Sequence, residues 1–189
     1  METFLVSTAV VALAEIGDKT QLLAMVLAAR YAKPVPIIFG ILAATIANHL
    51  LAALGGYYLA SFLSGKIFQF GVALSFIAMA AWTLVPDKID DDETKTASHA
   101  SAFFATLVTF FLVEIGDKTQ IATAALAARF HDVVIVAAGT TTGMMIADVP
   151  AVFLAGTALK RIPLRYVRFA AAAIFFALGI WGLIVAMRM

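Results

Sequence analysis

The chain contains no cysteine, which excludes disulfide bonds and thiolate metal sites and leaves its redox compartment unreadable. Charge is scarce as well: Asp, Glu, Lys and Arg together make up 13% of the 189 residues, and the formal net charge is +1. So small a net charge provides no field for binding nucleic acid. The N-terminus also lacks the basic segment of a cleavable signal peptide, so we expect the first apolar stretch to be retained as a helix.

Apolar residues are what the chain has in abundance, at 63% of the sequence with a mean hydropathy of +0.99. Soluble domains contain about 45–50% apolar residues, so this composition indicates an integral membrane protein in contact with the lipid bilayer. The apolar runs are continuous rather than alternating, which predicts helices. Six transmembrane helices are predicted, from about Phe4 to Ala29, Val35 to Leu63, Ile67 to Val85, Ala102 to Ala128, Val133 to Leu159 and Tyr166 to Met187.

The two halves of the sequence repeat each other. A shift of 99 positions superimposes residues 15–21 on 114–120, and a slip of one residue in the second helix of each half pairs Asn48 with Asp148. We therefore predict an all-α membrane protein with two three-helix repeats, residues 1–86 and 102–189, joined by an acidic hydrophilic loop at 87–101. Because three is an odd number, the second repeat must enter from the opposite side of the membrane, which gives inverted topology.

The basic residues of the loops predict the orientation. Arg30, Lys33, Lys88 and Lys95 share one side with the basic loop at 160–168, whereas the other side has only three basic residues. Basic residues collect on the cytoplasmic side, so we expect both termini to lie outside a cytoplasmic membrane. The sequence does not indicate an oligomeric state.

The most informative feature is the string Glu-Ile-Gly-Asp-Lys-Thr, which occurs at 15–20 and again at 114–119, each time within an apolar run. A charge at the centre of a bilayer costs about 2.5–3.5 kcal/mol on insertion scales, so a cost accepted twice points to function. The glycines would let another helix approach or let the helix unwind. We predict one cation site where the repeats meet, formed by Glu15, Asp18, Glu114 and Asp117.

Carboxylate, hydroxyl, amide and backbone oxygens suit hard cations such as Mn²⁺, Ca²⁺ and Mg²⁺. Clustered carboxylates also attract protons, because like charges oppose ionisation. Competition between a cation and protons for one site is the minimal mechanism of an exchanger. The alternative is that each lysine merely neutralises the glutamate four residues before it. Further candidates for metal binding or proton coupling are Lys19, Thr20, Gln21, Asn48, Lys118, Thr119, Gln120 and Asp148. His49 could relay protons, although a packed core histidine explains it as well.

The two complete motifs resemble those of the small cation/proton exchangers defined by twin E-x-G-D-[KR]-[ST] strings, and the resemblance covers essentially the whole chain. It implies that Glu15, Asp18, Glu114 and Asp117 bind the cation and exchange protons. Eukaryotic members of that family act in the Golgi on manganese and calcium, and bacterial members export manganese. The short chain resembles a bacterial member, which implies manganese export across the cytoplasmic membrane.

We therefore expect a transporter rather than an enzyme, one that exports Mn²⁺ or Ca²⁺ in exchange for protons and needs no cofactor. Two alternatives remain open at this point. One is export of another small solute such as an amino acid, although the paired carboxylates disfavour an anion. The other is an intramembrane aspartyl protease, in which Asp18 and Asp117 would be catalytic; the lysine after each aspartate argues against it.

Overall fold

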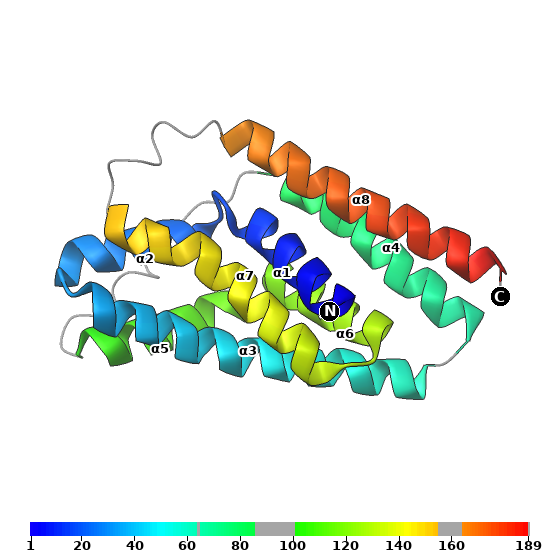
Figure 1. The fold of residues 1–189 in the computed structure, drawn as a ribbon, viewed down its shortest axis with the longest axis horizontal. Coiled ribbons are helices and arrows are strands. Elements are labelled where there is room, and N and C mark those ends of the chain that lie inside the picture. The colour runs from blue at the N-terminus through cyan, green and yellow to red at the C-terminus, as the bar shows by residue number, and fades with distance from the viewer. Residues whose placement is uncertain (64, 86–100, 155–163, 189) are drawn as a thin grey trace.

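The computed structural model describes residues 1–63, 65–85, 101–154 and 164–188, and the fold is helical throughout these ranges (Figure 1). The acidic loop, except for Ser101, and the basic residues Lys160 and Arg161 lie outside the described residues. The helices are α1 (Glu2–Glu15), α2 (Lys19–Tyr31), α3 (Pro34–Phe62), α4 (Lys66–Thr83), α5 (Ala102–Glu114), α6 (Lys118–Phe130), α7 (Val133–Leu154) and α8 (Leu164–Arg188).

Four segments are long and apolar enough to cross a membrane: Pro34–Phe62, Lys66–Thr83, Val133–Leu154 and Arg168–Arg188. They coincide with four of the predicted spans, which confirms an all-α membrane protein. The two remaining spans, predicted as continuous helices, are each broken into two shorter helices at the repeated string. The first contains α1 and α2, and the second contains α5 and α6. Unwinding at the glycine, which the sequence allowed, is what the structure shows.

Contacts between helices follow the repeat. A Cβ added to Gly40 of α3 would lie 2.7 Å from the Thr106 Cβ of α5, and one added to Gly139 of α7 would lie 2.8 Å from the Ser7 Cβ of α1. Both glycines and both partners are related by the offset of 99. Glycine is needed here because it lets two helices approach closely in lipid, where packing rather than water drives association. The shared close approach makes α3–α5 and α7–α1 equivalent pairs.

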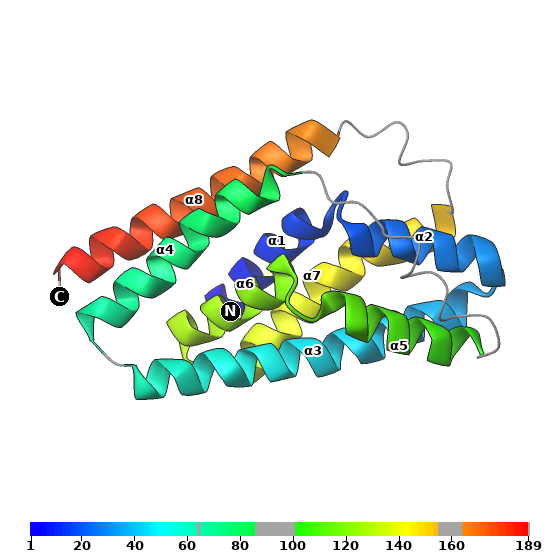
Figure 2. The same cartoon turned by 180° about the vertical axis from the view of Figure 1, so that it is seen from behind.

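The last helix of each half, α4 and α8, run side by side as a separate pair (Figures 1 and 2). Phe76 and Phe175, which are counterparts in the repeat, stack on each other with ring centroids 6.4 Å apart. Gly179 of α8 fits so closely that an added Cβ would lie 2.5 Å from the Ile77 side chain and 3.0 Å from the Ala73 carbonyl oxygen. This tight interface makes α4 and α8 one packed unit beside the remaining helices.

Candidate functional site

The site is built on the two helix breaks. Gly17 and Gly116 have φ values of 81° and 78°, a left-handed conformation that glycine adopts without a steric penalty. Asp18 and Asp117 then occupy the N-cap positions of α2 and α6, where aspartate is favoured. Each break therefore places a glutamate at the end of one helix and an aspartate at the start of the next. The string also leaves backbone groups free of helical partners, which is how broken helices make ion sites.

Two glutamines support these breaks. The Gln21 Oε1 accepts a hydrogen bond from the Gly17 N–H at 2.8 Å, and the Gln120 Oε1 accepts one from the Gly116 N–H at 2.7 Å. The Gln21 amide also donates to the Ala147 carbonyl at 2.9 Å, so it joins the break to the opposite repeat. The sequence offered these glutamines as candidates for metal binding or proton coupling, with a role in helix contacts equally open. In the structure their oxygens accept hydrogen bonds from backbone N–H groups.

Asn48 has the equivalent bridging role in the other half. Its Oδ1 accepts a hydrogen bond from the Gln120 amide at 3.5 Å, and its Nδ2 donates one to the Phe111 carbonyl at 3.0 Å. Since Gln21 contacts residue 147 and Gln120 contacts residue 48, the offset of 99 holds through this part of α3 and α7. The slip that paired Asn48 with Asp148 was therefore wrong. The counterpart of Asp148 is His49.

The two strings face each other through reciprocal ion pairs. The Lys118 Nζ lies 2.8 Å from the Asp18 Oδ1, and the Lys19 Nζ lies 3.5 Å from the Asp117 Oδ1. The Lys19 Nζ also donates to the Val113 carbonyl at 3.0 Å, at the C-terminal end of α5. Each lysine thus reaches the aspartate of the opposite repeat. These contacts run between the two strings, whereas the alternative that sequence spacing allowed was a pair within one string.

The glutamates are held by the threonines of their own strings. Thr20 donates a hydrogen bond to the Glu15 Oε1, and Thr119 donates one to the Glu114 Oε2 at 2.9 Å. Both glutamates are fully buried. Among the described residues, the second carboxylate oxygen of each has no hydrogen-bond partner. Such an oxygen retains its capacity to bind a proton or a cation.

Asp148 of α7 adds a fifth buried carboxylate. It is fully buried, and it directly follows Ala147, whose carbonyl accepts the hydrogen bond from the Gln21 amide. Neither of its oxygens has a hydrogen-bond partner within the described part of the chain, and the same holds for both ring nitrogens of its counterpart His49. A strict offset of 99 is the sequence signal that would have identified this pair.

The carboxylates do not converge on one point as they stand. Within residues 1–63, 65–85, 101–154 and 164–188, no group of three or more His, Asp or Glu side chains is arranged to hold a metal ion. An ammonium group lies against an aspartate in each half.

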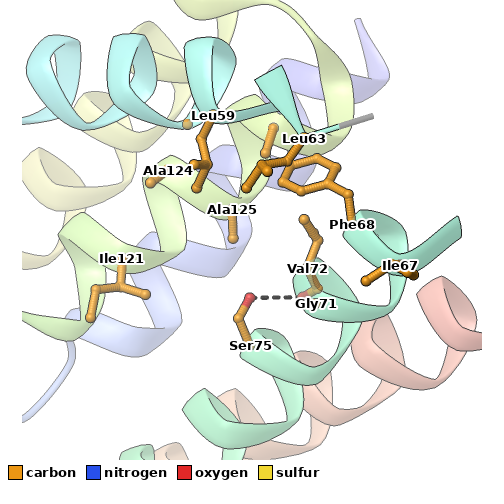
Figure 3. Close-up of a pocket in the computed structure, with 12 residues that line it drawn as sticks. Leu59, Leu63, Ile67, Phe68, Gly71, Val72, Ser75, Ile121, Ala124 and Ala125 are labelled. Atoms are coloured by element: carbon orange, nitrogen blue, oxygen red, sulfur yellow. Dashed lines mark hydrogen bonds between the residues drawn. The ribbon is translucent and has the colours of Figure 1, made fainter. Parts of the chain in front are cut away.

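The described part of the chain also has a pocket of about 620 Å³ between α3, α4 and α6 (Figure 3). None of these acids lines it. Leu59, Leu63, Phe68 and Val72 are among its lining residues. The hydroxyl of Ser75 is turned to the Val72 carbonyl at 2.7 Å, which leaves the walls apolar. Such a lining offers no ligands for an ion, so this pocket is not the cation site.

The sequence of the chain was compared with those of known proteins. A family model described as "Divalent cation/proton antiporter GDT1" matches residues 3–91 and 102–189. A relative from Vibrio cholerae serotype O1, named "Putative manganese exporter", is 45% identical over 181 residues, which cover 95% of this chain and 90% of the relative. No solved structure matches the chain.

These matches cover both repeats and agree with the family that the twin motifs resemble. They describe membrane transport, so the protein is a transporter and not an enzyme, and the aspartyl protease alternative is wrong. With buried acids at two helix breaks, apolar spanning helices and a match over nearly its whole length, the chain belongs to the divalent cation/proton antiporter family.

Proposed function

We propose that the protein exports a divalent cation across the cytoplasmic membrane in exchange for protons, with Mn²⁺ as the preferred cargo and Ca²⁺ as a second. The observation that carries this proposal is the reciprocal pairing of lysine and aspartate between the two strings. It brings the acids of both repeats into one buried region, as a single site between the repeats requires. The manganese assignment is supported by the relative's name and by the oxygen-rich set of side chains.

In the proposed site Glu15, Asp18, Glu114 and Asp117 are the ligands. A divalent cation would displace the Lys19 and Lys118 ammonium groups from the aspartates and attract the uncommitted oxygens of the glutamates. Four carboxylates and two lysines sum to a charge of −2, which one divalent cation neutralises. Protons neutralise the same groups, so cation and protons compete, and each drives release of the other.

The remaining candidates have supporting roles in this proposal. Thr20 and Thr119 orient the glutamates, while Gln21, Gln120 and Asn48 hold the breaks open. Asp148 is assigned to proton coupling, because it is fully buried, follows the Ala147 that Gln21 contacts, and has no engaged oxygen among the described residues.

Six transmembrane spans in two inverted repeats complete the proposal. The breaks would then lie near the middle of the membrane, and rocking between the repeats would expose them to each side in turn. The matched glycine contacts of α3–α5 and α7–α1 support such a symmetric frame. The excess of basic loop residues supports placing both termini outside.

The test is metal-driven proton movement in proteoliposomes. Addition of Mn²⁺ on one side should drive protons to the other, as read by a pH-sensitive dye, and Ca²⁺ or Mg²⁺ should be compared in the same assay. Glu15→Gln and Asp117→Asn should abolish the signal. Asp132→Asn is the matched control, because it removes an acid outside the site while asparagine still caps α7 through the Ile135 N–H. Full activity in either site variant would exclude the proposed ligands.

A further inference from the structure

The two repeats contain equivalent helices, but equivalent residues on α2 and α6 differ in how exposed they are. Ala125 of α6 is 7% exposed, whereas its counterpart Val26 of α2 is 39% exposed although it is the larger side chain. Likewise Ala128 is buried and Ala29 is exposed. Helix α6 is less exposed along this face than α2, although Ala125 and Ala128 also line the pocket between α3, α4 and α6, so the repeats differ in what lies beside them.

The cause is the position of the α4–α8 pair. Helix α4 packs on α6, and α8 packs on α1. The symmetric contacts would be α8 on α2 and α4 on α5, and neither forms to a comparable extent among the described residues. Figures 1 and 2 show the pair beside α1 and α6, with α2 and α5 towards the far end of the molecule. The pair is tightly packed internally, so it is expected to move as a unit.

The uncovered position has a surface suited to the same pair. One face of α5 carries an exposed apolar stripe that ends at the second helix break. Its members are Phe104, Val108, Leu112 and Ile115. Gly116, beside the end of the stripe, is exposed, whereas its counterpart Gly17 is buried. The helix break at Gly17 is therefore covered and the one at Gly116 is not, so the two repeats differ in exposure although their sequences correspond.

A cation–π contact holds the pair where it is. The Arg129 guanidinium, in the last turn of α6, lies 3.8 Å from the centre of the Trp181 ring of α8. Gly182, the next residue, packs closely on α4, since an added Cβ would lie 3.0 Å from the Ala73 Cβ, and the Arg129 Nη1 lies beside it at 3.9 Å. Arginine suits this contact because its planar cation stacks on aromatic faces.

The repeat contains the same two residues a second time. The offset of 99 relates Arg129 to Arg30 and Trp181 to Trp82. The surroundings correspond too, because each arginine lies 5.9 Å from the ring that follows it, Tyr31 or Phe130. In the six-span topology, Arg30 and Trp82 lie on the opposite membrane side from Arg129 and Trp181. No described cation lies over the Trp82 ring in this structure.

We propose that Arg129–Trp181 and Arg30–Trp82 are the two gates of the transport cycle and that they close alternately. This structure has the Arg129 gate closed. When it opens, the α4–α8 pair moves onto α2 and α5, Arg30 stacks on Trp82, and the covered and uncovered breaks exchange roles. The inference rests on the proposed exchange cycle and assigns residues to its switching step.

The test uses the absence of cysteine from the chain. A single reporter cysteine, Ala128→Cys or its counterpart Ala29→Cys, is labelled with a maleimide in proteoliposomes without metal. Trp181→Leu should raise the labelling rate of Ala128→Cys roughly 2- to 30-fold, the range that one cation–π contact supports, and should lower that of Ala29→Cys. Arg129→Lys, which keeps the charge but loses the planar stack, should act in the same direction.

The decisive variant is Trp82→Leu, because it is remote from Ala128. It should lower the labelling rate of Ala128→Cys over the same roughly 2- to 30-fold range, since it destabilises the state in which that side is open. An unchanged labelling rate of Ala128→Cys in Trp82→Leu would overturn the proposal. So would a rise in that rate with both Trp82→Leu and Trp181→Leu, because a general loss of stability would raise it in both variants. Transport is measured separately, so intact Mn²⁺ exchange with unresponsive labelling would reject the gates and leave the proposed function standing.

Discussion

The two glutamines that hold the helix breaks have unequal surroundings, and this inequality predicts unequal effects of the same substitution. Gln21 makes two buried hydrogen bonds of 2.8 and 2.9 Å, to the Gly17 N–H and the Ala147 carbonyl. Gln120 makes an exposed bond of 2.7 Å and a long one of 3.5 Å. Leucine is similar in size to glutamine and removes only the polar groups.

Gln21→Leu leaves the buried Gly17 N–H without its partner, at about 1–3 kcal/mol, and loses one bond to the Ala147 carbonyl, at about 0.5–1.5 kcal/mol, because a carbonyl inside α7 also has a helical donor. Together these give a loss of about 1.5–4.5 kcal/mol. Gln120→Leu loses one bond whose donor is exposed and one that is nearly broken, so about 0.5–1.5 kcal/mol is expected, the net value of a single hydrogen bond. We therefore expect Gln21→Leu to be the more destabilising of the two substitutions.

Thermal unfolding in one detergent provides the measurement. For a chain of this size, 1 kcal/mol shifts the Tm by about 2–4 °C. Gln21→Leu should lower the Tm by about 3 °C or more, and Gln120→Leu by roughly 1–6 °C. Gln21→Glu and Gln120→Glu are matched controls that keep the acceptor oxygen for the glycine N–H. An equal loss of Tm in the two leucine variants would refute the unequal contribution of the two glutamines to stability.

Two other predictions concern α3 and the second string. Gly56→Ala should destabilise the protein by about 1–3 kcal/mol, because the added Cβ would clash with the Ala124 carbonyl oxygen, a backbone atom that cannot move aside like a flexible side chain. Gly55→Ala, the neighbouring change with nothing within 4 Å, should be close to neutral, and equal Tm values for the two would contradict the close α3–α6 contact. Thr119→Val should raise the apparent KM for Mn²⁺ by about tenfold or more, since a hydrogen bond to a charged group contributes about 1.5–3 kcal/mol; Thr119→Ser should restore it, and failure of that rescue would argue against the Glu114 contact.

Much of the site could be read in the sequence because it depends on local chemistry. An acid in an apolar run is visible without coordinates, and so are its repetition and the glycine that permits a break. The partners of these groups were less accessible. Lys19 is four residues from Glu15, which made a local pair plausible, yet its ammonium lies near Asp117 and the Val113 carbonyl. Only the approach of two helices distant in sequence decides between such partners.

The glutamines and Asp148 show a second reason for incomplete prediction. An amide can bind a cation or a backbone N–H equally well, and the choice depends on whether the neighbouring helix is broken. The pairing of Asp148 with His49 was obscured because a one-residue slip improved the match of Asn48 and Gly56 in the aligned repeats. The contacts of Gln21 and Gln120 resolve that register, since hydrogen bonds depend on position and not on residue similarity.

By itself the sequence determined that this is a helical membrane protein, that it is duplicated, and that its acids come in two matched strings. These properties follow from hydropathy and repetition, which can be read from the order of the residues without knowing which of them meet in space. Only the tertiary structure decided that the strings pair reciprocally and that the α4–α8 pair lies on one side of the frame. Which helices the pair contacts depends on packing in three dimensions, and neither hydropathy nor repetition along the chain specifies it.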